Sequence, residues 1–586
     1  YLAEKRIAFD LNDDDFANGI KSITKAFLND SSSDNEISML TDTLFTSIIP
    51  TELMNWEKNA KTWSNTAANW VARLTSILIE TVPLNKLTAV NESVVSTVFS
   101  IFKDSGSIPS IGLYGGITPI DNHSEANDEM KFDGLLKDYM KFDPIKSHLF
   151  SLASFNISKS FTTRKDFLTV DKIEELSKEL ARSTIPIILQ EISLLDGDNS
   201  LFAYELSKVM SENLVKGAVT SIISDDSYNS QEFPSLLTEE LSFYIANEAI
   251  TESLNIDSEN WEIAKIAESL SRGTMIGAQM AAIHEKSLDY TAGWESYERK
   301  QLAKSSAFGS SKGASEARFK YWDDANPNMK EELAPQARFD LVQISHSSAV
   351  GSMIGGVAMS NYFPHPNDNI ALINFAAQGT TAGSMNGIIG DISDQDSTES
   401  FEIEIARASS HGATLGASFQ TVALTNANPD SKTADRLTLD SVQAATYGST
   451  FGAIAGIGDK SNSSTEPKDS LILKQATKQG SIEGALLGSS LGSGYAVDSE
   501  NEKNIRSRSA IIKSVAETNA NAAQSANSNK ATKAIKTSTN DMLKLMKKFN
   551  INPRFTNPTK VFKTRIIKNE EEDFPVEDQL KVASPI

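Results

Sequence analysis

A signature of one small residue followed by two glycines, each four positions apart, recurs seven times between residues 269 and 484. A clear copy is Ala408, Gly412 and Gly416, whereas the weakest copy has Phe375 in the first small position. A spacing of four keeps such residues on one stripe of an α-helix, so each copy predicts a helix with a flat, nearly side-chain-free face. The glycines expected to pack against neighbouring helices are Gly273, Gly277, Gly309, Gly313, Gly351, Gly355, Gly379, Gly383, Gly412, Gly416, Gly448, Gly452, Gly480 and Gly484.

The spacing between successive copies indicates one helix per repeat. The first glycines recur about every 35 residues, which is room for one helix of twenty-odd residues and a connector, with chain direction alternating. Glycine inside a helix costs about 1 kcal/mol relative to alanine, so fourteen of them forgo roughly 14 kcal/mol, comparable with the stability of a whole domain. Close approach of neighbouring backbones, where a Cβ would clash, is the compensation we expect.

The predicted fold is all-α, a multi-helix array of about seven glycine-striped single-helix repeats preceded by a separate helical domain. Residues 1–257 form the predicted N-terminal helical domain, residues 258–499 the repeat domain, and residues 500–586 a polar helix with an extended basic, then acidic, arm. Helices before the repeats are expected near residues 88–103, 134–154, 171–195, 201–224 and 234–254.

Tryptophans seven positions apart mark an apolar ladder over residues 52–81. Trp56, Trp63 and Trp70 alternate with small residues in steps of three and four, which is typical of a helix seam packed against a partner. A buried core seam is the preferred interpretation. A membrane-interface or ligand-stacking face is the alternative.

Charge is distributed unevenly over the repeats. Asp, Glu, Lys and Arg are absent from residues 341–367, 370–390, 408–429 and 441–458, which belong to repeats three to six. Such runs reach the length of a bilayer span, about 20 residues. They also contain many Ser, Thr, Asn and Gln residues, and the mean hydropathy of the chain is −0.27. Burial inside a helical bundle is therefore expected, with conditional insertion into a membrane as the alternative.

A basic and aromatic segment near the C-terminus predicts a docking arm. Three interpretations stay open: docking on an acidic neighbouring copy, a solvated tail, or binding to nucleic acid or anionic lipid. Docking is preferred because the rest of the chain is so acidic. The candidate docking residues are Lys547, Lys548, Arg554, Phe555, Lys560, Phe562, Lys563 and Arg565.

Composition narrows the class of protein. The formal net charge of −22 over 586 residues argues against general nucleic-acid binding, which needs clustered positive charge. The absence of cysteine excludes disulfides and thiolate metal sites, and it favours an extracellular, cell-envelope or virion-associated setting.

The sequence contains no convincing catalytic or metal-binding motif. Gly309, Ser311 and Gly313 match the G-x-S-x-G nucleophile elbow, but that motif needs a preceding strand, and the glycine repeat already supplies the match. The six histidines are scattered, and no metal, cofactor or catalytic residue is predicted. His346 and His411 lie beside glycine stripes in uncharged stretches, as buried hydrogen-bonded histidines or as a pH trigger.

Three functions remain open. The preferred one is a non-enzymatic structural or assembly protein, a helical scaffold that forms a homo-oligomer or docks on partner subunits. The alternative is a helical protein of the pore-forming or virion-ejection type that inserts repeats three to six into a membrane. The third is an enzyme or small-ligand binder whose site is assembled from scattered residues.

Overall fold

The computed structural model describes the helical parts of the chain. The described residues are 13–29, 31–58, 66–102, 144–164, 169–195, 199–224, 232–256, 261–286, 294–325, 335–360, 366–389, 398–426, 431–458, and the helical positions 476, 477, 480, 481, 484, 485 and 488. Within these ranges nearly every residue is helical and no strand occurs, which confirms the all-α multi-helix array.

The first part of the array contains helices of very different lengths. They are α2 (Asp13–Phe27), α3 (Asp34–Lys58), α4 (Thr66–Thr81), the 3₁₀ turn η1 (Leu84–Lys86), α5 (Leu87–Phe102), α7 (Pro144–Arg164), α8 (Val170–Arg182), α9 (Ile185–Ser193), α10 (Ser200–Ile223) and α11 (Glu232–Ile256).

The prediction of one helix over residues 171–195 was wrong, because α8 and α9 are separate helices. The chain turns at Ser183 and Thr184, and Pro186 occupies the first turn of α9. Proline is accepted in the first turn of a helix, but in an interior it removes a hydrogen bond and clashes with the preceding turn. Pro186 therefore explains why the helix ends here. The periodic pattern of apolar residues continues past this proline and does not predict the break.

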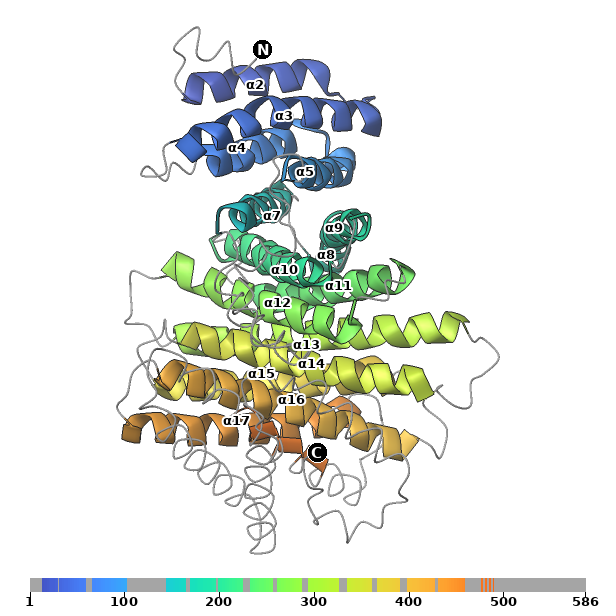
Figure 1. The fold of residues 1–586 in the computed structure, drawn as a ribbon, viewed down its shortest axis with the longest axis vertical. Coiled ribbons are helices and arrows are strands. Elements are labelled where there is room, and N and C mark those ends of the chain that lie inside the picture. Colours follow the sequence, from blue (N-terminus) through green and yellow to red (C-terminus); the bar gives the residue numbers. More distant parts are fainter. Residues whose placement is uncertain are drawn as a thin grey trace, which may run out of the picture.

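The glycine-striped part contains one helix for each of the first six repeats. These are α12 (Ile263–Lys286), α13 (Trp294–Ala325), α14 (Pro335–Ser360), α15 (Pro366–Ile389), α16 (Thr398–Asn426) and α17 (Ser431–Gly458), and the described positions of repeat seven are helical too. The helices lie crosswise to the long axis of the molecule, like rungs, with α2 at one end and α17 near the other (Figure 1).

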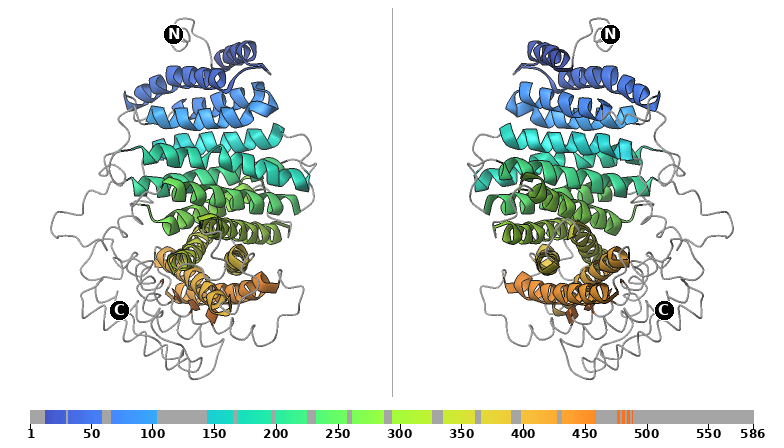
Figure 2. Two further views of the ribbon diagram at one scale, coloured as in Figure 1. Left: turned by 90° about the vertical axis from the view of Figure 1, so that its right-hand side faces the viewer. Right: turned by 90° about the vertical axis from the view of Figure 1, so that its left-hand side faces the viewer.

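The rungs form two layers, because from α12 to α17 each helix makes its main contacts with the helix two before it, while α10 packs on α7 and, among the helices before it, α11 packs mainly on α8. The first layer runs α7, α10, α12, α14 and α16, and the second layer runs α11, α13, α15 and α17. Consecutive helices contact each other less and join the layers. Figure 2 shows the rungs from both sides, with the later ones rotated relative to the earlier ones.

The buried apolar core continues across residue 257, the predicted domain boundary. One cluster of buried side chains extends from Phe16 on α2 to Ile344 on α14, and it includes Leu241 on α11 and Ile266 on α12. Helices α10 and α12 lie on opposite sides of that boundary and pack directly on each other. A division at residue 257 is thus a change of sequence pattern within one continuous core.

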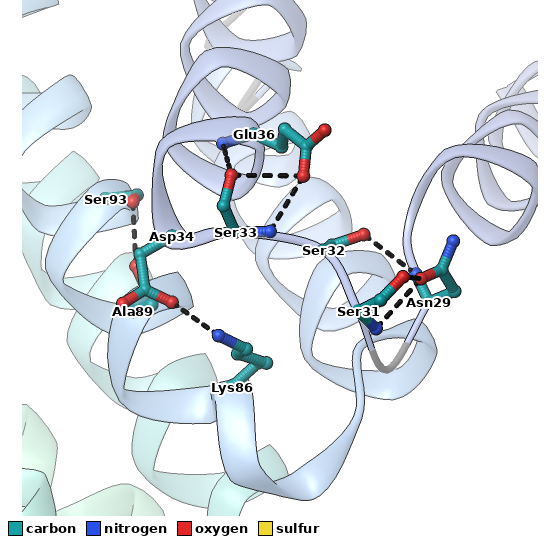
Figure 3. A network of polar contacts seen from close by, with 9 residues as sticks. All are labelled: Asn29, Ser31, Ser32, Ser33, Asp34, Glu36, Lys86, Ala89 and Ser93. Atoms are coloured by element: carbon teal, nitrogen blue, oxygen red, sulfur yellow. Dashed lines mark hydrogen bonds and ion pairs between the residues drawn. The ribbon is translucent and has the colours of Figure 1, made fainter.

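The start of α3 shows how the end of the array is fixed (Figure 3). The amide of Ser33 donates to Oε2 of Glu36 at 2.7 Å, and the amide of Glu36 donates to Oγ of Ser33 at 3.3 Å. This reciprocal pair is a capping box, which satisfies amides that have no partner inside the helix. Lys86, in η1, binds Asp34 at 2.9 Å and ties the same helix end to the chain before α5.

Removal of this cap gives a modest, testable effect. We expect Ser33→Ala to lower the free energy of unfolding by about 1 kcal/mol, while Ser38→Ala, exposed on the same helix, leaves it level or slightly raises it. Urea unfolding followed by circular dichroism measures both. Equal stability of the two variants would mean that the capping box does not stabilise α3.

The same cap makes stability depend on pH. The hydrogen bonds from Ser33 hold the pKa of Glu36 below its usual 4.5. A depressed carboxyl pKa contributes stability above the unfolded-state value, and that contribution is lost as the pH falls through the lower folded-state pKa.

Candidate functional site: the glycine seams

The glycine stripes lie against rows of carbonyl oxygens, and we call each such contact a glycine seam. A Cβ built on Gly351 of α14 would overlap the carbonyl oxygen of Glu268 on α12, and one built on Gly355 would lie 2.9 Å from that of Arg272. Real Cβ atoms essentially never approach within 3.0 Å. Only glycine therefore permits this backbone separation, where Cα–H···O contacts and dispersion stabilise the pair.

The two helices of a seam run in the same direction. Gly355 follows Gly351 by one helical turn, and Arg272 follows Glu268 by one turn, so both rows advance together. Helices within a layer are therefore parallel. The i±4 row that presents glycines is also the row that sets the register between the helices.

Every one of the fourteen glycines expected to pack against a neighbour meets such a carbonyl oxygen. The partners, in order from Gly273 to Gly484, are the carbonyls of Lys208, Glu212, Glu239, Phe243, Glu268, Arg272, Lys304, Phe308, His346, Val350, Asn374, Gln378, Arg407 and His411. Each seam joins a helix to the helix two before it, so the stripe determines the layers as well as the spacing.

One helix takes part in two seams through different faces. Gly309 of α13 lies against the carbonyl of Glu239 on α11. Its neighbour Phe308 offers its own carbonyl to Gly383 of α15. Because adjacent residues are about 100° apart around a helix, the presenting face and the receiving face point to different neighbours. The same geometry can be repeated from helix to helix.

Four further glycines belong to seams but were not among the predicted packing residues. Gly387, Gly456 and Gly488 each continue a stripe by one turn, so simple extension in steps of four would have found them. Gly217 lies alone on α10 against the carbonyl of Phe155 on α7. Its only sequence signal is a single glycine inside a long predicted helix. Such a glycine lowers helix stability, so its presence usually indicates close packing.

Small hydroxyl side chains fill the remaining space in the later seams. Oγ of Ser311 lies 2.6 Å from Oγ1 of Thr380 across the α13–α15 seam. Across the seam between α16 and repeat seven, Oγ of Ser410 on α16 lies 2.6 Å from both Oγ of Ser481 and the carbonyl oxygen of Thr477. A buried hydroxyl costs free energy unless it is hydrogen-bonded, and these side chains are small enough to bond without separating the backbones.

Ser311 is also the serine of the G-x-S-x-G match. It lies inside α13, fully buried and bonded to a threonine. A nucleophile elbow requires an exposed serine on a strand-to-helix turn, so the match is a by-product of the glycine spacing.

Buried charge is concentrated where the array is still rich in apolar side chains. Lys208 pairs with Glu205 on α10, and Lys265 pairs with Glu268 on α12, each at 2.6 Å. Burial raises the pKa of Glu212, although Lys208 and other cations nearby act in the opposite direction. Removing one member of such a pair would leave an uncompensated buried charge.

The charge-free stretches of α14 and α16 contain buried histidines. Nε2 of His346 on α14 lies 3.0 Å from Nδ1 of His411 on α16, and the side chains are 1% and 3% exposed. Burial, the charge on His411 and that on Lys265, in this order, lower the pKa of His346 well below 6.5. The sequence suggested either buried hydrogen-bonded histidines or a pH trigger, without predicting a contact between them, and the structure brings the two rings together.

The tryptophan ladder is divided between two helices. Helices α3 and α4 pack on each other, so the ladder is not one straight helix as the heptad spacing suggested. Trp70 is 1% exposed, meets Phe16 edge to face at 5.3 Å between ring centroids, and has the guanidinium of Arg73 at 5.7 Å. Trp63 and the side chain of Trp56 lie outside the described residues.

Within the described ranges, no group of three or more His, Cys, Asp or Glu side chains is placed to hold a metal ion. No described helix combines the length and apolarity needed to cross a membrane. The docking arm, from Lys547 to Arg565, lies outside the described residues.

No protein-family model, curated protein or solved structure matches this chain.

Proposed function

We propose that this protein is a non-enzymatic scaffold that associates with copies of itself or with partner subunits. Its helices are stacked in two layers, and the helices within a layer run parallel. The observation that supports this most is the unbroken series of glycine seams. Each seam is a contact between two backbones, so the helices cannot slide or separate by side-chain rearrangement alone. A body built this way keeps its length and register under load, which is what a scaffold requires.

Exposed apolar side chains near both ends of the stack support association. Phe27 and Met39, on α2 and α3, are 69% and 70% exposed, and Phe451 on α17 is 62% exposed. The two ends carry different residues, which favours contacts between unlike surfaces.

An acidic cluster on the side of the stack is a suitable acceptor for the basic arm. Glu174 on α8, Glu240 on α11 and Glu316 on α13 all raise the pKa of Tyr244, after burial and a hydrogen bond to Glu174. Burial raises the pKa of Glu240, Glu174 raises it further, and Lys312 lowers it. These carboxylates come from three helices and act on the same tyrosine, with Lys178 and Lys312 close by. The arm residues, from Lys547 to Arg565, have the opposite charge.

Light scattering of the purified chain tests association directly. We expect the full chain to be larger than a monomer and its association to weaken in high salt, because the arm contacts are ionic. A chain ending at residue 540, and the pair Glu174→Gln with Glu240→Gln, should both dissociate more readily. Asp42→Asn with Asp324→Asn removes two exposed charges elsewhere and is the matched control.

Two results would contradict the proposal. A full chain that is monomeric at every concentration would exclude self-association. Association that is equally strong without residues 541–586 would exclude the arm as its cause. Dye release from anionic liposomes at neutral or acid pH would instead favour the membrane-inserting alternative that uses repeats three to six.

A further inference from the structure

The His346–His411 pair lies at a point where α14, α16 and repeat seven meet. The rings contact each other with their centroids 5.0 Å apart. The carbonyl oxygen of His346 receives Gly412 of α16, and the carbonyl oxygen of His411 receives Gly484 of repeat seven. The same two residues therefore belong to two consecutive seams and to the polar contact between α14 and α16.

The hydrogen bond between the rings limits how many protons the pair can hold. One facing nitrogen must carry a proton and the other must offer its lone pair. A first added proton can go to an outer nitrogen with the bond retained. Once both rings are protonated, both facing nitrogens carry a hydrogen, the bond is lost, and two positive charges face each other where 3.0 Å separated the nitrogens.

The surroundings of the pair disfavour positive charge. From α12, Lys265 acts on His346, and Glu268 is bonded to that lysine at 2.6 Å. On the α16 side, Arg407 lies one turn before His411, and α17 has Asp440 as the one charged residue among its described side chains. From α13, Arg318 binds Asp340 of α14 at 2.8 Å. The side chains described for α15 are all uncharged.

We propose that the His346–His411 pair is an acid-sensitive latch, which holds α14, α16 and repeat seven together at neutral pH and releases them when both rings are protonated. This goes beyond the scaffold function, because it gives one place in the stack a condition under which it opens. The latch does not depend on whether the chain assembles.

The direction of the effect follows from proton linkage. A histidine whose folded-state pKa lies below its unfolded value of 6.5 binds more protons when the structure opens. The closed state is therefore fully favoured above pH 6.5. Between pH 6.5 and the lower folded-state pKa, the equilibrium constant for opening increases up to tenfold per pH unit for each such histidine, and below that pKa the increase stops.

Amide hydrogen exchange of the full chain between pH 7.5 and pH 4.5, corrected for intrinsic exchange rates, tests the latch. We expect peptides of α14 and α16 to lose protection about tenfold per pH unit below pH 6.5, relative to peptides of α10. His346→Gln with His411→Asn places an amide nitrogen or oxygen near each facing ring nitrogen without a titrating group. That variant should keep constant relative protection.

A matched control and a second readout complete the test. His284→Gln removes a histidine from the last turn of α12 and should behave like the parent chain. Among the histidine proton resonances of the parent chain, that of His346 should titrate below pH 6.5. If α14, α16 and α10 lose protection in parallel in the parent chain, or if the double variant keeps the pH dependence, the latch is wrong. The first comparison needs no variant to fold.

Discussion

Replacing Gly448 by alanine is expected to lower the free energy of unfolding by about 2 to 4 kcal/mol. The same substitution in an open helix would stabilise by about 1 kcal/mol, because alanine is the better helix former. The sign reverses because the new Cβ would overlap the carbonyl oxygen of Asn374 and lie 2.9 Å from Cβ of Ala377. Both are backbone or near-backbone atoms, so the α15–α17 seam must open as a whole.

Two other glycines provide graded controls for this measurement. Gly19 on α2 has no atom within 4 Å of a built Cβ, so Gly19→Ala should stabilise. Gly356 would meet the end of the Leu372 side chain at 3.1 Å, which can move, so Gly356→Ala should change stability little. In urea unfolding, Gly19→Ala should be the most stable of the three variants, Gly356→Ala intermediate and Gly448→Ala the least stable. If Gly448→Ala melted like Gly19→Ala, close backbone packing would not be what the glycines provide.

Trp70→Ala is expected to lower the free energy of unfolding by about 3 to 5 kcal/mol. The indole is almost fully buried, and its loss leaves a cavity beside Phe16, which is its edge-to-face neighbour on α2. Because α2 contacts the array mainly through α4, we expect α2 to detach before the rest of the stack unfolds. Hydrogen exchange of α2 peptides measures this local loss.

Phe27→Ala is the control for that variant. It removes an aromatic ring from the same helix, but the ring is 69% exposed, so stability should change by less than about 0.5 kcal/mol. Should Trp70→Ala also be nearly neutral, the buried tryptophan would not stabilise the end of the array.

The glycine residues show how much of this fold follows from the sequence. Glycines such as Gly412 and Gly416 predicted both the helix and its packing face. Few structures other than closely packed helices offset the loss of helix stability that glycine causes. The stripe did not identify which neighbour each face meets. That requires the carbonyl row of the helix two before, whose residues, for example His346 and Val350, have side chains of unrelated kinds. Every residue has a backbone carbonyl, so the residue types of the receiving helix do not reveal which carbonyls face the glycines.

Other features depend on contacts that sequence spacing does not encode. The histidines at positions 346 and 411 were recognised separately, but their pairing depends on the register of the α14–α16 seam. The acidic cluster that includes Glu174 and Glu316 comes from three helices far apart in the chain. The proline at position 186 is present in the sequence, but the periodic pattern of apolar residues continues through it and suggests a single helix.

The two-layer arrangement also restricts how such a chain can change in length. From α12 on, each helix is joined by a glycine seam to the helix two before it, so successive helices belong to alternate layers and run in alternate directions. Inserting or deleting one helix would move every later helix to the wrong layer and reverse it relative to its partner. Inserting or deleting two leaves every later seam in place. Descendants of this chain should therefore differ from it by even numbers of helices.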